Sequence, residues 1–255
     1  MRVYPRRSSA LAQWSRRLGL FGIAVVLAGI AVARWGIFPA HQGLIVVGAG
    51  VAVSALALLL AVAAYVDIWQ SGASGLTRAN LGLLLALANL VVPAYQIVQA
   101  FRLPPINDVS TDPVDVPAFS RARTALEARG GRIPEIPGED ARARQKRAYA
   151  DLEPVILEMT PEETFDLVLE VAATLKWQVI DKAPPSARAG AGRIDATART
   201  SVMRFTDDIT IRIRPQANQT RVDIRSASRF GTHDLGVNAA RIRAFSTALN
   251  EAGRG

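Results

Sequence analysis

The segment DDITIRIRPQANQTRVDIRSASR, residues 207–229, decides the fold of the C-terminal half of this chain. Apolar and polar residues alternate through DDITIRIRP and again through TRVDIRSASR, with the period of two that a β-strand imposes on its side chains. The four residues QANQ between these runs predict a turn, so the segment predicts an antiparallel hairpin. The face of the hairpin that is predicted to lie on the core carries Ile209, Ile211, Ile213, Val222 and Ile224.

The opposite face of the hairpin is predicted to point outward and to be charged. Arg212 and Arg214 should lie across from or diagonal to Asp223, and Asp208 should approach Arg225. Opposite charges at such positions stabilise a sheet by about 0.2–1 kcal/mol per pair. The hairpin therefore predicts a sheet with one apolar face and one charged face.

Further elements on both sides of the hairpin indicate an α+β domain. The run TPEETFDLVLEVAATLKW predicts a helix with Thr160 as N-cap, Pro161 at the first position and Glu163 at the capping-box position. The runs at 177–181 and 192–205 predict two more strands, and a last helix is predicted from about Asp234. The order predicts a two-layer domain, in which a mainly antiparallel four-stranded sheet carries flanking helices on one face.

The N-terminal part of the chain has a different composition. Three apolar stretches, at residues 18–38, 43–66 and 81–101, each have the roughly 20 residues that an α-helix needs to cross a bilayer. A signal peptide is the alternative for the first stretch, but its apolar core is long and further spanning stretches follow it. We therefore expect a membrane anchor of three transmembrane helices over residues 1–103 and a soluble domain over residues 104–255.

The positive charge of the chain is concentrated in the expected anchor. Eight arginines and one aspartate give residues 1–103 a charge of +7, which leaves +1 of the total of +8 for the soluble domain. That near-neutral domain disfavours nucleic-acid binding. The chain has no cysteine, which excludes disulfides and thiolate chemistry.

The arginines of the N-terminal tail also predict the orientation. Because positive residues stay in the cytoplasm, the N-terminus is predicted inside and the domain after three crossings outside. The arginine-rich composition indicates a bacterial protein. The predicted location is therefore the inner (cytoplasmic) membrane, with a periplasmic or otherwise extracytoplasmic C-terminal domain.

Three motifs of the soluble part resemble a known family. INDVSTDP, FTDDITIRI and VDIRSASRFGTHDLGVNAARI together resemble the family catalogued as domain of unknown function 1499, over roughly Ile106 to Leu249. The resemblance implies no reaction. It implies signature positions at Asp207, Asp208, Arg225, Ser226, Ser228, Arg229, Gly231, Asp234, Gly236, Asn238 and Arg241. Two residues depart from the pattern: His233 does not belong to it, and Asp108 stands where the family often has a cysteine.

A hydrolase is one interpretation of these residues. The available members of a Ser–His–Asp arrangement are Ser226 or Ser228, His233, and one of Asp207, Asp208 and Asp234. No G-x-S-x-G elbow occurs, and a solvated turn histidine is the simpler interpretation of His233. Two carboxylates acting as general acid and base, as in a glycosidase, would require a geometry that a sequence does not contain.

A metal site is a second interpretation. Oxygen ligands for calcium or magnesium are available either in Asn107, Asp108, Asp112 and Asp115 or in Asp207 with Asp208. The EF-hand spacing is absent, and adjacent residues of a strand face opposite sides. Turn capping in a Pro- and Asp-rich loop is the favoured alternative, so we assign no metal and no cofactor.

An anion site is the third interpretation. Arg225 and Arg229 precede the last helix, whose N-terminus Asp234 would cap, and a helix N-terminus flanked by arginines can bind phosphate or carboxylate. The alternative is a structural network in which aspartates already pair with the arginines. Candidate residues for either role are Asp207, Asp208, Arg225, Ser226, Ser228, Arg229, Asp234, Asn238 and Arg241.

These observations favour a non-catalytic binding or interaction module of the cell envelope. Its expected partners are the lipid bilayer and an anionic small molecule or envelope partner. The alternative is an envelope hydrolase that acts on an anionic substrate. A transport role is disfavoured because the apolar stretches carry no acid or base at their centres.

Overall fold

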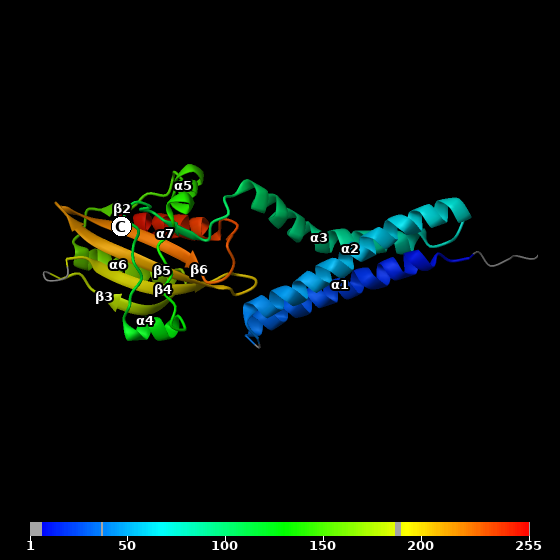
Figure 1. Cartoon of the computed structure of the whole chain (residues 1–255), viewed down its shortest axis with the longest axis horizontal. Helices are drawn as coiled ribbons and strands as arrows, with labels where there is room; N and C mark the ends of the chain where they lie inside the picture. The colour runs from blue at the N-terminus through cyan, green and yellow to red at the C-terminus, as the bar shows by residue number, and fades with distance from the viewer. Residues whose placement is uncertain (1–6, 37, 187–189, 255) are drawn as a thin grey trace, which may run out of the picture. The chain divides into compact units, whose positions relative to one another are not determined.

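The computed structural model describes residues 7–36, 38–186 and 190–254. The chain divides into two compact units (Figure 1). One unit comprises Met1–Gln99 with Ser201–Arg204, and the other comprises Ala100–Thr200 with Phe205–Gly255.

Three long helices form most of the first unit: α1 (Ala10–Trp35), α2 (Ala40–Ser71) and α3 (Leu76–Arg102). Within the described residues, these three are long and apolar enough to cross a membrane. Small residues let α1 and α2 approach closely, because a Cβ atom on Gly50 would lie 2.8 Å from the carbonyl oxygen of Gly22. The amide of Asn89 in α3 donates a hydrogen bond to Ser54 of α2 at 2.7 Å. All three helices begin before the apolar stretches that predicted them.

The described part of the second unit contains a six-stranded antiparallel sheet, with the order β1-β6-β5-β4-β3 and with β2 also paired to β6. The four predicted strands are β3 (Gln178–Ala183), β4 (Gly192–Arg199), β5 (Thr206–Gln216) and β6 (Gln219–Ser228). The two that were not predicted are β1 (Asp108–Ser110) and β2 (Val155–Leu157). The predicted number of four strands is therefore wrong, because three residues are too few to show an alternating pattern.

The two strands of the hairpin pair as predicted, and the structure selects one of the two arrangements that the sequence left open for Arg212 and Asp223. Ile211 lies opposite Ile224 and Arg212 lies opposite Asp223. The preceding strand ends earlier than predicted, since β4 stops at Arg199 and residues 200–205 form a loop. The backbone N–H of Thr200 closes this loop by donating to the carbonyl of Phe205 at 2.9 Å.

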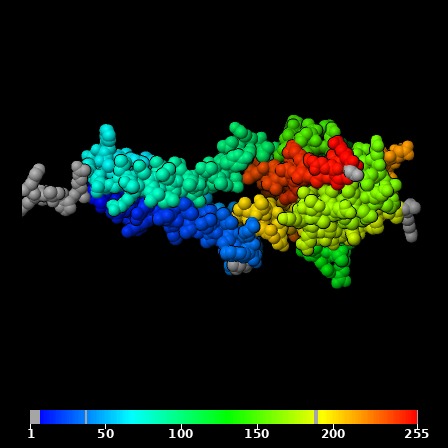
Figure 2. All heavy atoms as spheres, turned by 180° about the vertical axis from the view of Figure 1, so that it is seen from behind, coloured from blue at the N-terminus to red at the C-terminus, as the bar shows by residue number. Residues whose placement is uncertain are grey.

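Helices α6 (Pro161–Thr174) and α7 (Val237–Ala252) cover one face of the sheet. Figure 2 shows them side by side, α6 in yellow-green and α7 in red. The core beneath them contains the predicted isoleucines and valines of β5 and β6 together with Val168, Ile242, Phe245 and Leu249. The predicted capping box of α6 is confirmed.

The other face of the sheet differs from the prediction. A covering segment, residues 111–138, crosses it and includes α4 (Arg123–Ala128); it is drawn in green across the sheet in Figure 1. Thr210, Asp223 and Arg225 on this face are 0% exposed. The prediction of an outward charged face is therefore wrong, because strand alternation is the same whether polar side chains meet water or polar protein groups.

Helix α5 (Glu139–Ala148) covers the free edge of β1. The side-chain amide of Gln145 accepts the backbone N–H of Ser110 at 3.1 Å and donates to the carbonyl of the same residue at 2.6 Å. The amide thus takes the place of a neighbouring strand, which protects the edge from pairing with another chain.

Candidate functional site

The nine candidate residues do not form one cluster, because β5 and β6 send alternate side chains to opposite faces of the sheet. The face under α7 carries Asp207, Ser226 and Ser228, and the face under the covering segment carries Asp208 and Arg225. Asp234, Asn238 and Arg241 belong to α7 and the turn before it. The arrangement is therefore two polar networks on opposite faces.

The network under α7 is centred on Arg241. Its guanidinium donates to Ser226 at 2.8 Å and to Asn238 at 2.6 Å, and it forms an ion pair with Asp207 at 2.5 Å. The amide of Asn238 donates to Ser228 at 2.9 Å. Burial raises the pKa of the Asp207 carboxyl above its ordinary value of 3.8, although Arg241 opposes the shift.

A carboxylate of the chain itself binds backbone N–H groups at the N-terminus of α7. The carboxylate of Asp234 accepts the backbone N–H groups of Gly236 at 2.9 Å and Asn238 at 2.8 Å. The helix begins at Val237 rather than at Asp234. Gly236, rather than the predicted Asp234, is therefore the N-cap residue of α7. The Asp234 carboxylate nevertheless occupies backbone donors that an external anion would need.

The network under the covering segment is centred on Arg225. Its guanidinium binds Asp108 through two bonds of 2.9 and 2.7 Å and donates to the carbonyls of Pro117 and Glu135. The ring of Phe119 lies 4.8 Å from it, at cation–π distance. Burial raises the pKa of the Asp108 carboxyl, with Arg225 acting against the shift.

The sequence predicted that Asp208 would approach Arg225, but its hydrogen-bond partner is Arg229. It accepts two hydrogen bonds from Arg229, at 3.0 and 2.7 Å, and lies 3.5 Å from Arg129. Arg129 also forms an ion pair with Asp195 at 2.7 Å, in which both side chains are 0% exposed. The sequence did not point to Arg129, because it lies in a short charged stretch without a periodic pattern.

The aspartates that could have formed a metal site bind arginines, and the side-chain amide of Asn107 donates to the carbonyl of Gly231. Asp112 and Asp115 of the covering segment form ion pairs with three arginines of the hairpin, which also surround Asp223. These arginines are Arg212, Arg214 and Arg221. The cluster fastens the covering segment to the sheet.

His233 lies in the turn before α7 and binds backbone atoms. Its Nδ1 accepts the N–H of Leu235 at 3.1 Å, and its Nε2 lies 3.3 Å from the carbonyl oxygen of Ala100. The candidate serines instead bind Asn238 and Arg241. Among the described contacts, therefore, a Ser–His pair that could generate a nucleophile is absent.

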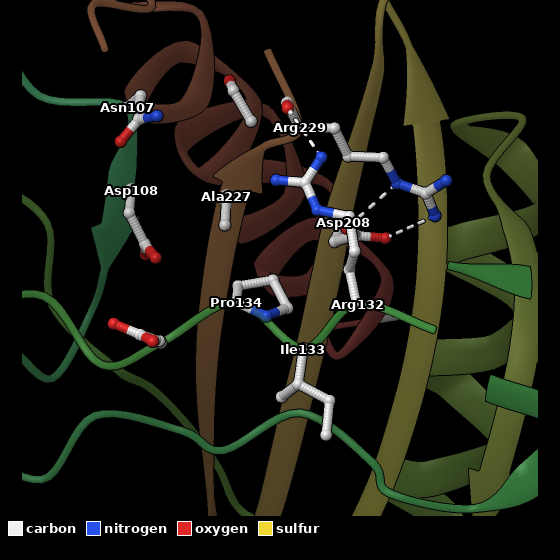
Figure 3. Close-up of a pocket in the computed structure, with 10 residues that line it drawn as sticks. Asn107, Asp108, Arg132, Ile133, Pro134, Asp208, Ala227 and Arg229 are labelled. Carbon is white, nitrogen blue, oxygen red and sulfur yellow. Dashed lines mark hydrogen bonds and ion pairs between the residues drawn. The ribbon is translucent and has the colours of Figure 1, made fainter. Parts of the chain in front are cut away.

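A cavity of about 190 Å³ opens beside the network under the covering segment (Figure 3). Asp108 and Asp208 line it from either side of Ala227, because both lie opposite that residue in the sheet. Arg132 of the covering segment and Arg229 line it as well. A second cavity of about 290 Å³ shares lining residues with it, namely Asn107, Asp108 and Glu135.

Sequence reasoning missed the contribution of Arg132 to this cavity. Two glycines, Gly130 and Gly131, precede Arg132, and such a pair indicates a loop. In the structure both have positive φ values, 63° and 79°. A loop signal does not say which strand the loop will cross. Only the folded chain brings Arg132 to the ends of β5 and β6.

Comparison with known proteins agrees with the resemblance noted in the sequence. Residues 108–249 match the family described as "Protein of unknown function (DUF1499)". A search of curated proteins finds no match. Among solved structures, the chain is similar to the vertebrate conserved region of human METTL16, with 12% identity and a TM-score of 0.28 over 38% of this chain and 97% of that one. A TM-score this low does not indicate a shared fold.

Proposed function

This chain belongs to the DUF1499 family of proteins of unknown function, and from its geometry we propose that it is a membrane-anchored, non-catalytic binding module. Residues 1–103 are the anchor and residues 104–255 are the binding domain. The anchor lies in the inner membrane of a bacterium with the N-terminus in the cytoplasm. The domain is extracytoplasmic, and its partner is an anionic small molecule or another component of the cell envelope.

One observation carries this proposal: a polar cavity lies beside charged residues that are already paired with one another. Beside the cavity, Arg225 is held by Asp108 and Arg229 by Asp208. Both carboxylates and Arg225 are largely buried, and such pairs resist rearrangement because separating them leaves a buried charge without a partner. The networks therefore act as a rigid frame, and the adjoining cavity is the place for a ligand.

Ligand-dependent thermal stability tests the proposal. The full chain in lipid-free detergent is screened against anionic, cationic and neutral small molecules. A molecule that binds the folded state raises the unfolding temperature with increasing concentration. Ala227→Val narrows the cavity and should abolish the rise, whereas Ala244→Val on the exposed side of α7 should retain it.

Two results would contradict the proposal. One is a panel in which every class of molecule leaves the unfolding temperature unchanged. The other is turnover of an anionic ester by the purified chain that disappears in His233→Ala, since this would place a catalytic group where the geometry supports none.

A further inference from the structure

The charges around the 190 Å³ cavity leave one cation without an acidic partner. Asp108 is bound by Arg225 through two hydrogen bonds, and Asp208 is bound by Arg229 in the same way. Arg132 has a single hydrogen bond in the described structure, from Nη1 to the carbonyl of Arg229 at 3.4 Å. Among the described ion pairs, Arg132 takes part in none.

The position of Arg132 suits the binding of a ligand. In Figure 3 its side chain extends across the cavity toward the backbone of Arg229. Because only Nη1 is engaged, the other guanidinium nitrogens can donate to an oxyanion in a paired arrangement. The cavity volume of about 190 Å³ is several times the roughly 30 Å³ that one water occupies, which is enough for a small oxyanion.

Glu135 also lines this cavity and is exposed. Its backbone carbonyl accepts a hydrogen bond from Arg225. Asp108 and Asp208 of the lining are paired with arginines, whereas the Glu135 carboxylate takes part in none of the described ion pairs and would oppose an anion. Removing that charge should strengthen the binding of an anion.

The covalent chain keeps this cavity near the end of an apolar helix. Asp108 follows Arg102, the last residue of α3, by six residues. Six residues span at most about 20 Å when fully extended. If α3 crosses a bilayer, the phosphate groups of lipid headgroups lie within the reach of this linker.

We propose that the cavity binds a phosphate group through the guanidinium of Arg132. The phosphate belongs either to a phospholipid headgroup or to a soluble phosphate ester, since both present the same oxyanion. The inference rests on the proposed function and names the ligand class of that binding module.

The test compares four full-length chains: wild type, Arg132→Ala, Glu135→Gln and Arg123→Ala. Arg123 serves as the matched control because its side chain is 91% exposed and forms a surface ion pair within α4. Isothermal titration in lipid-free detergent measures the affinity for glycerol 3-phosphate. We expect Arg132→Ala to weaken it about tenfold or more, Glu135→Gln to tighten it and Arg123→Ala to leave it unchanged.

The two sources of phosphate are then distinguished in nanodiscs of phosphatidylglycerol. If the headgroup is the ligand, it competes, and the wild-type affinity for glycerol 3-phosphate falls relative to detergent. If the ligand is soluble, the affinity is the same in both settings. Arg132→Lys keeps the charge but not the paired donors, and it should show an intermediate loss.

Equal affinity in wild type and Arg132→Ala would overturn the inference. So would the absence of phosphate binding in every chain while a carboxylate, a sugar or a cation raises the unfolding temperature. In that second case the proposed function stands and only the ligand class is wrong. If none of these molecules binds, both the inference and the proposed function fail.

Discussion

Arg225 combines complete burial with a full positive charge, and the protein satisfies it with one carboxylate and two carbonyls. Arg225→Ala would leave Asp108 buried without its partner, which costs about 3–5 kcal/mol of unfolding free energy. Arg123→Ala should change stability little, because its ion pair is exposed. Denaturant titration of both variants measures the difference, and equal unfolding free energies would contradict the structural role of Arg225.

Replacing both Arg225 and Asp108 tests whether the unpaired carboxylate causes the loss of stability. The double variant Arg225→Met with Asp108→Leu removes both charges at once, so it should be more stable than Arg225→Ala. A double variant as unstable as the single one would show that packing, rather than the unpaired acid, causes the loss.

The pKa of Asp207 gives a second prediction for a single residue. Burial raises this pKa above 3.8 and Arg241 opposes the shift. An acid whose pKa is raised by folding binds protons more tightly in the folded state. Its contribution to stability therefore grows as the pH falls from above the folded pKa toward 3.8, and it is lost as the pH rises again.

Arg241→Met removes the opposing charge and should raise the pKa of Asp207 further. The gain in unfolding free energy that Asp207 gives on acidification should then begin at a higher pH. Carboxyl carbon NMR of the labelled aspartates measures the titration. Asp151, whose pKa is lowered by hydrogen bonds from Arg243, is the internal control and should not move. An unchanged or lower pKa at Asp207 would contradict the role given to Arg241.

At the scale of an element, the start of α6 depends on local chemistry. The Thr160 hydroxyl accepts the N–H of Glu163 at 3.3 Å, and the Glu163 carboxylate accepts the N–H of Thr160 at 3.0 Å. Thr160→Ala should lower the unfolding free energy by about 1 kcal/mol. Hydrogen exchange should accelerate in the first turn of α6, whereas Thr174→Ala at the other end should leave that turn unchanged.

The covering segment, in contrast, has a position that no local pattern predicts. The sequence predicts irregular loops at residues 103–119 and 130–140 and a short helix between them, and α4 (Arg123–Ala128) agrees with that helix. The position of the covering segment depends on Asp112 and Asp115, which bind arginines of β5 and β6 about a hundred residues later in the chain. The segment is placed by these ion pairs, and strand alternation alone does not reveal them.

At the scale of the whole molecule, the topology can be tested directly. The proposal places the C-terminus outside the cytoplasm, so a C-terminal reporter enzyme that is active only there should be active. A chain that ends at Gly72, after two of the three apolar helices, should reverse the result. Activity of a strictly cytoplasmic reporter at the full-length C-terminus would overturn the predicted orientation.

The sequence by itself determined the three apolar helices, the hairpin, the capping box of α6 and membership of the family. These features follow from local composition, from periods of two or 3.6 residues and from contiguous motifs. Only the tertiary structure decided the two short strands, the separation of the candidate residues between two faces and the cavity with Arg132. The physical reason is the range of the contacts: Arg225 and Asp108 are 117 residues apart, and a charged residue does not specify its partner until packing brings one within hydrogen-bond distance.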